Sequence, residues 1–268
     1  MYGANAAAWI EIFNNVDVFI VVFVRVMGFF IILPVMAGQN LPLPARIGLS
    51  LSLALLAFTS NIIVLPEYQF TIIGFGFLLA QEFVLGLIIG FVVMIMFSMF
   101  HFVGQLVDFQ IGFSMVSVAD PFGQQQTPIT GNLYYLLVSL FFIGTGALNL
   151  VIGAFFDSFA IVGIGEAVVL GNQPLMYYML EIIISYFVLG LRIALPVIGT
   201  VVIIDIVLGI LVKAVPQMNM FVVGLPIKVF IGLIVVYLTM PLLRTAFEWV
   251  MYDVVMYIYN IIVGTTVT

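Results

Sequence analysis

The chain contains six long apolar runs, and their length constrains its fold more than any other feature. They lie approximately at residues 8–33, 46–65, 70–100, 133–156, 175–212 and 221–263. A helix of about 20 apolar residues crosses the hydrocarbon core of a bilayer, and a helix satisfies its own backbone hydrogen bonds without water. Because 65% of the residues are hydrophobic and only 7% are charged, the chain has too few polar side chains to cover a water-soluble domain. We therefore predict an all-α integral membrane protein with about six hydrophobic segments.

The longest runs predict long kinked helices and helical hairpins. Residues 46–65 and 133–156 each fit a simple crossing. Residues 175–212 and 221–263 exceed one upright crossing of about 20 residues, so each fits either a tilted long helix or a broken hairpin. Three prolines lie in these two runs, namely Pro196, Pro226 and Pro241. Proline removes an amide donor and clashes with the preceding turn, which predicts a kink or an interruption at each position.

The composition argues against several classes of function. The chain has no cysteine and one histidine, which nearly excludes metal sites and Cys/His chemistry. We find no sequence motif for a catalytic nucleophile, a phosphate-binding loop or a dinucleotide cofactor. A net charge of −6 and six scattered basic residues argue against a nucleic-acid partner. The sequence therefore predicts a protein that is not an enzyme and needs no cofactor.

Several charged side chains lie inside the apolar runs, where each charge costs on the order of 2.5 to 3.5 kcal/mol by insertion scales. They are Arg25, Glu82, Arg192, Asp205, Arg244, Glu248 and Asp253. Arg244 and Glu248 are four residues apart and are expected to pair locally. Arg25, Glu82 and Asp205 have no local partner in the sequence. We expect them to pair between helices or between subunits, with a transport or proton pathway as the alternative.

The connection between the third and fourth runs, residues 104–130, has an unusual composition for a surface loop. Gly104, Asp108 and Gly112 are spaced by four residues, which places them on one face of a helix. The stretch 111–118 that follows is apolar and has no helical period. Two interpretations remain open: an interfacial loop, or a loop that folds back into the protein, where protein or a water-filled cavity would cover its backbone.

The last two runs carry the most specific sequence pattern. It consists of Asp205-Ile-Val-Leu-Gly209, Pro216-Gln-Met-Asn219-Met-Phe221 and Gly224-Leu-Pro226-Ile-Lys228. This pattern resembles the signature of the FliR family, the export-gate component of flagellar and injectisome type III secretion, which includes the SctT proteins. Earlier residues resemble the family in order and spacing: Arg25-Val-Met-Gly28, Pro34, Pro42, Arg46, Glu82, Gly86, Asp108, Gly112 and Asp120-Pro121. The resemblance covers nearly the whole chain.

The resemblance implies a place in a protein-conducting assembly. FliR-like proteins join FliP-like and FliQ-like subunits in a helical channel, with a FlhB-like protein at its base, and unfolded export substrates pass through it. The expected location is the bacterial inner membrane, in lipid contact, within the basal body of a flagellum or injectisome. The family further implies one membrane-embedded domain over residues 1–268, with a FliP-like portion at 1–174 and a FliQ-like hairpin at 175–268. The role would be needed for flagellum assembly.

The family also implies three groups of site residues. A channel plug in the central loop would include Ile111, Gly112, Phe113, Ser114, Met115 and Val116, with Phe113 and Met115 closing the channel. An entrance loop would include Pro216, Gln217, Met218, Asn219 and Phe221. Charge pairing between subunits would involve Arg25, Glu82, Asp108, Asp205, Lys213 and Lys228.

Two other classes of function remain as alternatives. A secondary transporter would bind a small solute or ion near the middle of the membrane at broken helices, and it would show two related halves, which we do not find in the sequence. An intramembrane enzyme would need a set of acid, base or nucleophilic residues that one histidine and no cysteine hardly supply.

Overall fold

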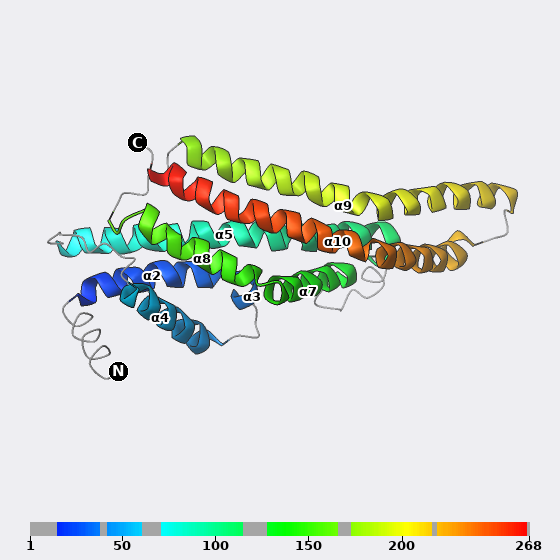
Figure 1. The fold of residues 1–268 in the computed structure, drawn as a ribbon. Coiled ribbons are helices and arrows are strands. Elements are labelled where there is room, and N and C mark those ends of the chain that lie inside the picture. Colours follow the sequence, from blue (N-terminus) through cyan, green and yellow to red (C-terminus); the bar gives the residue numbers. More distant parts are fainter. Residues whose placement is uncertain are drawn as a thin grey trace. The chain divides into compact units, whose positions relative to one another are not determined.

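The computed structural model describes residues 15–37, 42–60, 71–114, 128–165, 173–215 and 219–266, and the regular secondary structure of these residues is helical (Figure 1). The helices are α2 (Val16–Ile32), α3 (Pro34–Ala37), α4 (Leu43–Thr59), α5 (Ile72–Ile111), α7 (Ile129–Gly144), α8 (Ala147–Ile161), α9 (Gln173–Ala214) and α10 (Met220–Thr266). Each of the six apolar runs contributes at least one helix. The prediction of an all-α membrane protein is confirmed.

Three of the described helices are long and apolar enough to cross a membrane. They are α5 with 40 residues, α9 over Leu175–Ala214 and α10 over Val222–Gly264. The pair α7 and α8 qualifies as a fourth crossing if the two are taken as one bent span. By comparison, α2 and α4 have 17 residues each, or about 25 Å at 1.5 Å per residue, which is shorter than a hydrocarbon core of about 30 Å.

The run at residues 133–156 does not form the simple crossing that we predicted. It belongs to α7 and α8, whose axes differ by 69°. Helix α7 ends at Gly144, and Gly146 adopts a positive φ of 77°, which is strained for any other residue. The Thr145 hydroxyl donates to the carbonyl of Phe141 at 2.7 Å and so occupies an acceptor at the helix end. A glycine in the left-handed region is what turns the chain here.

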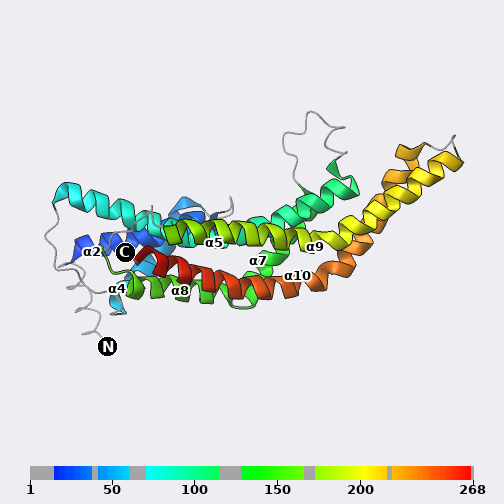
Figure 2. The same cartoon turned by 90° about the horizontal axis from the view of Figure 1, so that it is seen from above.

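The prolines in the last two runs do not interrupt their helices. Helix α9 continues through Pro196, and α10 continues through Pro226 and Pro241. Figure 2 shows that both helices bend along their length. Of the two alternatives for these runs, the long helix is therefore the observed one. The sequence predicted a kink or an interruption at each proline, and neither helix is interrupted there.

Contacts between Cα atoms group the residues into two compact units. Unit 1 comprises Met1–Ile95, Leu148–Ile182 and Asp253–Thr268, and unit 2 comprises Met96–Ala147 and Ile183–Tyr252. The division into portions 1–174 and 175–268 follows the family resemblance rather than these contacts, and it stays a prediction.

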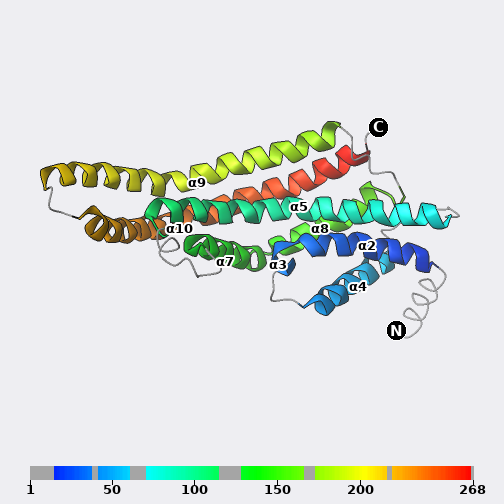
Figure 3. The same ribbon diagram turned by 180° about the vertical axis from the view of Figure 1, so that it is seen from behind.

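In unit 1, α2 packs against α3 and α4, and Figures 1 and 3 show α2 beside α4. Its core includes Phe29 of α2 stacked on Phe155 of α8, with 4.6 Å between ring centroids. In unit 2, Phe97 meets Phe142 of α7 edge to face at 5.4 Å, and Phe102 stacks on Phe187 of α9 at 5.3 Å. Phe29, Phe155, Phe97 and Phe142 are buried, and large aromatic surfaces buried in this way supply much of the packing energy of each unit.

Candidate functional site

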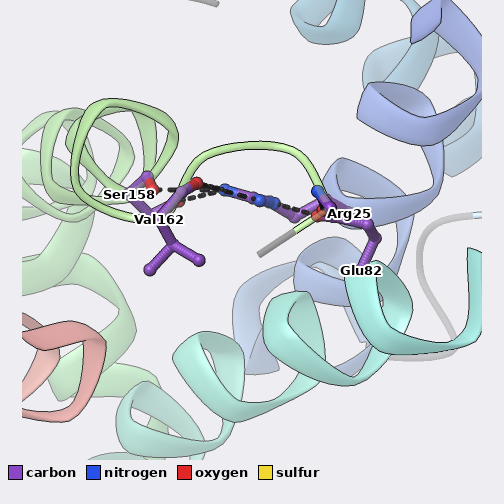
Figure 4. Close-up of polar contacts among 5 residues, drawn as sticks. Arg25, Glu82, Ser158 and Val162 are labelled. Atoms are coloured by element: carbon purple, nitrogen blue, oxygen red, sulfur yellow. Dashed lines mark hydrogen bonds and ion pairs between the residues drawn. The ribbon is translucent and has the colours of Figure 1, made fainter. Parts of the chain in front are cut away.

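A buried ion pair lies in the core of unit 1. Arg25 of α2 is 0% exposed, and Glu82 of α5 is 3% exposed. The Arg25 Nε donates to Glu82 Oε2, and Figure 4 shows the two side chains meeting from separate helices. The partners are 57 residues apart in the sequence. The pairing between helices that we expected for Arg25 and Glu82 is therefore present within this chain.

The remaining donors of Arg25 bind the carboxyl end of α8. Nη1 donates to the Ser158 carbonyl and the Val162 carbonyl, both at 3.2 Å, and Nη2 donates to the Val162 carbonyl at 3.2 Å (Figure 4). The carboxyl end of a helix carries partial negative charge, so a cation is stabilised there. The Ser158 carbonyl also accepts the backbone N–H of Val162 at 2.9 Å. The guanidinium also lies over the ring of Phe159, with its central carbon 4.3 Å from the ring centroid. Arg25 thus ties α2, α5 and the end of α8 together.

Glycines bring α2 and α5 close enough for this contact. A Cβ on Gly86 would lie 2.1 Å from the Arg25 carbonyl oxygen, and a Cβ on Gly28 would lie 2.5 Å from the Phe83 carbonyl oxygen. Both distances are far below van der Waals contact. Small residues permit such close approach of helix backbones, which is a common means of helix association in membranes.

A second buried carboxylate, in unit 2, joins the two helices that flank the central connection, α5 and α7. Asp108 near the end of α5 is 5% exposed. Its two oxygens accept the backbone N–H of Thr130, each at 3.0 Å, and Oδ2 also accepts the N–H of Gly131 at 3.4 Å. These amides belong to the first turn of α7, where N–H groups have no partner within the helix and the dipole favours a negative charge. Asp108 therefore caps a helix that begins about 20 residues later in the chain.

The backbones of α5 and α7 also touch at this point. A Cβ on Gly104 would lie 2.3 Å from the Gly131 Cα. Helix α5 ends at Ile111, and the Asp108 carbonyl accepts the N–H groups of Gly112 at 3.1 Å and Phe113 at 3.0 Å. Gly112 has a φ of 99°, a conformation that suits glycine. Both ends of the central connection are held by the same aspartate.

The predicted plug residues divide into three groups in the structure. Ile111 is the last residue of α5 and is fully buried, and its side chain lies where a Cβ on Gly232 of α10 would fall, with Cγ1 at 2.6 Å. Gly112, Phe113 and Ser114 are partly buried. Met115 and Val116 lie outside the described residues. The plug assignment stays a prediction, with Ile111 anchoring the chain at its start.

The predicted charge-pairing residues of the last two helices lie in unit 2. Lys228 of α10 forms an ion pair with Asp205 of α9, and their side chains are 23% and 34% exposed. Lys213 is exposed in the last turn of α9. Pairing of any of these residues with another subunit stays a prediction.

Only part of the predicted entrance loop can be placed. Asn219 is exposed, and its carbonyl accepts the N–H groups of Val222 and Val223 in the first turn of α10. Phe221 belongs to α10. Pro216, Gln217 and Met218 lie outside the described residues.

Other predicted contacts have a clear outcome. Arg244 and Glu248 of α10 form an exposed ion pair at 3.1 Å, so the predicted local pairing is confirmed. Within the described part of the chain, no group of three or more His, Asp or Glu side chains is placed to hold a metal ion. Sequence reasoning missed the partners that are backbone groups, namely the carbonyls of Ser158 and Val162 and the amides of Thr130 and Gly131.

Long apolar helices, with a buried ion pair between α2 and α5, define an all-α integral membrane protein. Residues 16–254 match the family "Bacterial export proteins, family 1", so the chain belongs to this family of export proteins. It is 30% identical to the flagellar biosynthetic protein FliR of Bacillus subtilis over 226 residues, which cover 84% of this chain and 86% of that protein. The family resemblance seen in the sequence is confirmed.

Two further proteins of bacterial export systems are similar to this chain. The flagellar biosynthetic protein FliR of Aquifex aeolicus is 28% identical over 82% of this chain and 83% of that protein. The Yop proteins translocation protein T of Yersinia pestis is 29% identical over 80% of this chain and 82% of that protein. The chain is thus a membrane protein of a bacterial export family, whose members are export components rather than known enzymes.

Proposed function

We propose that this chain is a core component of the type III protein export gate. In this function it joins FliP-like and FliQ-like subunits to form the channel through which unfolded flagellar proteins are exported, with a FlhB-like protein at the base. The gate lies in the bacterial inner membrane, within the flagellar basal body. The observation that carries the proposal is the family match over residues 16–254, nearly the whole chain.

The low burial of two of the long helices supports a role for the chain as a subunit of an assembly. In α5, 61% of the most apolar window is buried inside the chain, whereas the corresponding windows of α9 and α10 are only 17% buried. These two helices therefore need cover from lipid or from other polypeptides. Apolar helix faces of this extent suit the hetero-oligomer that the proposed function requires.

The central connection is proposed as the channel plug. Residues 111 to 116 begin the part of the sequence that connects α5 to α7, and Asp108 bonds to the backbone at the end of α5 and at the start of α7. A segment fixed at its base can close a channel without losing its position. Residues 216 to 221 are correspondingly proposed to lie at the cytoplasmic entrance, since they connect α9 to α10.

A flagellar role is favoured over an injectisome role. The Bacillus subtilis relative, whose name is flagellar biosynthetic protein FliR, aligns over 86% of its length at 30% identity. The Yersinia pestis translocation protein aligns over a slightly smaller share at 29% identity.

The transporter alternative lacks support from the charges that suggested it. Arg25, Glu82 and Asp205 would have to bind a solute or relay protons, yet each has an ion-pair partner within the chain. A charge that has an ion-pair partner in the same chain is explained first as a structural contact.

The proposal is tested by removing the gene from the bacterium that encodes it. The deletion strain should lack flagellar filaments and should not secrete flagellin, and the plasmid-borne wild-type gene should restore both. Normal filaments and normal flagellin secretion in the deletion strain would overturn the flagellar role.

A further inference from the structure

Arg192 occupies an unusual position on α9. It is exposed, and among the described residues it has no hydrogen-bond or ion-pair partner. In this respect it differs from Arg25 and Arg244, which pair within the chain. Its neighbours at positions 188 and 195 are an exposed valine and an exposed leucine. A guanidinium among apolar side chains requires an acceptor, because burying an unpaired charge is unfavourable.

The depth of Arg192 argues against a lipid phosphate as that acceptor. Between Glu181 and Asp205 it is the sole charged residue. This apolar stretch of α9 is about 34 Å long at 1.5 Å per residue, close to the roughly 30 Å thickness of the hydrocarbon core. Arg192 lies near its middle. A partner at the same depth is best supplied by another protein helix.

The side chains around Arg192 form a regular seam. Ser185, Arg192, Gly199 and Ile206 recur every seven residues and are exposed, and the exposed residues Val188, Leu195 and Val202 recur between them at the same period. The opposite face of α9 carries buried residues such as Tyr186, Ala194 and Val201. A seven-residue repeat of this kind is the pattern of a helix that packs along another helix in a left-handed pair.

We propose that this seam, residues 185 to 206 of α9, is the docking face for an apolar helix of a second membrane protein that places one carboxylate opposite Arg192. Arginine binds a carboxylate through two parallel hydrogen bonds, and a single polar residue in an apolar seam fixes the register of the two helices. Ser185 and Gly199 flank Arg192 at one heptad on each side, and their small side chains let the partner backbone approach. The proposal rests on the proposed function in one respect, that the chain works in a hetero-oligomer.

Photo-crosslinking in the native membrane tests the seam. A photoreactive amino acid is placed at Leu195 or at Val202 of the full chain in the bacterium that encodes it, and adducts are identified by mass spectrometry. Both positions should crosslink to one helix of one membrane protein, at sites about seven residues apart, and that helix should contain an Asp or Glu at the level of Arg192. Adducts with lipid alone, or with a helix that has no carboxylate, would overturn the proposal.

Variants of Arg192 test the charge. Arg192→Glu should reduce both adducts at least tenfold by bringing two carboxylates together, Arg192→Lys should keep them, and Lys in place of the partner carboxylate should restore the adducts of Arg192→Glu. Arg192→Leu removes the charge without repulsion and should weaken the adducts, which keeps the test decisive if the Arg192→Glu chain does not accumulate. Undiminished adducts in either the Glu or the Leu variant would contradict the charge pairing.

A matched control separates this proposal from the proposed function. Leu238 of α10 is 66% exposed and lies off the seam, so any adduct formed there should be unchanged by Arg192→Glu. If the wild-type chain purifies with other membrane proteins but its seam touches only lipid, the seam is wrong and the export-gate function stands. If the wild-type chain purifies with no other membrane protein, both proposals fail.

Discussion

At the scale of single residues, two buried carboxylates of α5, Glu82 and Asp108, bind groups on neighbouring helices. Glu82 holds the guanidinium of Arg25, and Asp108 holds the first amides of α7. Removing one partner of a buried pair costs far more than the pair itself contributes, because an uncompensated charge remains. Substitution of either residue is therefore expected to destabilise the fold, since both side chains are buried.

Glu82→Gln should destabilise the chain by about 3 to 5 kcal/mol, because it leaves the Arg25 guanidinium buried without a counter-charge. The measurement is the thermal midpoint of the complex that purifies with the tagged chain in mild detergent. The double variant Arg25→Met with Glu82→Leu should recover a large part of the loss, since it removes both charges. Equal midpoints for the wild type and Glu82→Gln would show that the pair is not buried as described.

Asp108→Ala should free the N–H groups of Thr130 and Gly131, with a loss of about 0.5 to 2 kcal/mol that is typical of a helix cap. Hydrogen exchange of a peptide covering the start of α7 should become faster than in the wild type. Asp108→Asn is the matched control, because an amide oxygen still accepts from a backbone N–H. If exchange at the start of α7 is the same in Asp108→Ala, the cap makes no contribution.

At the scale of helices, close backbone contacts decide which elements pack together. Gly86 meets α2, and Gly104 meets the first turn of α7, with no room for a Cβ in either place. Glycine lowers intrinsic helix stability by roughly 1 kcal/mol relative to alanine. At these two positions the close packing of the helix backbones offsets that loss.

Gly86→Ala should lower the amount of folded chain in the membrane sharply, because its Cβ would lie 2.1 Å from the Arg25 carbonyl oxygen. Overpacking of this kind typically costs about 1 to 3 kcal/mol, occasionally more. Gly153→Ala on α8 is the matched control, since nothing lies within 4 Å of its Cβ, and it should be neutral or stabilising. Fluorescence-detected size exclusion of tagged chains compares the two, and similar profiles would contradict the contact.

The helices were largely predictable from the sequence, whereas their breaks and partners were not. Hydropathy located every apolar run, because burial in lipid or protein requires it along the whole helix. It did not reveal the break after Gly144, since a left-handed glycine leaves the apolar composition unchanged. Pro196 suggested a kink or an interruption, and α9 continues through it as one bent helix.

The candidate site was predictable as a set of residues but not as a set of contacts. The sequence singled out Arg25 and Glu82 as charges in need of partners, yet their separation of 57 residues gave no sign that they pair with each other. The carbonyls of Ser158 and Val162 carry no residue-type signal, so a pattern of side chains cannot identify them as acceptors.

At the scale of the whole molecule, the low burial of α9 and α10 means that the chain alone does not cover its own apolar helices. The proposed assembly would supply that cover, and within it the central connection is proposed to close the channel. Replacing Phe113 and Met115 with glycine should make the assembled complex leak ions, because two apolar closing side chains are lost. Conductance of the reconstituted complex in planar bilayers measures this, with a complex carrying Leu at both positions as the control. Unchanged conductance would remove the plug from the account.

The central claim is that this chain works as a subunit of a hetero-oligomeric export gate. Its most direct test is purification of the affinity-tagged chain from its own bacterium in mild detergent, followed by size exclusion and mass spectrometry. The account predicts a single large complex that contains FliP-like and FliQ-like membrane proteins. A well-folded monomer without other membrane proteins would contradict it.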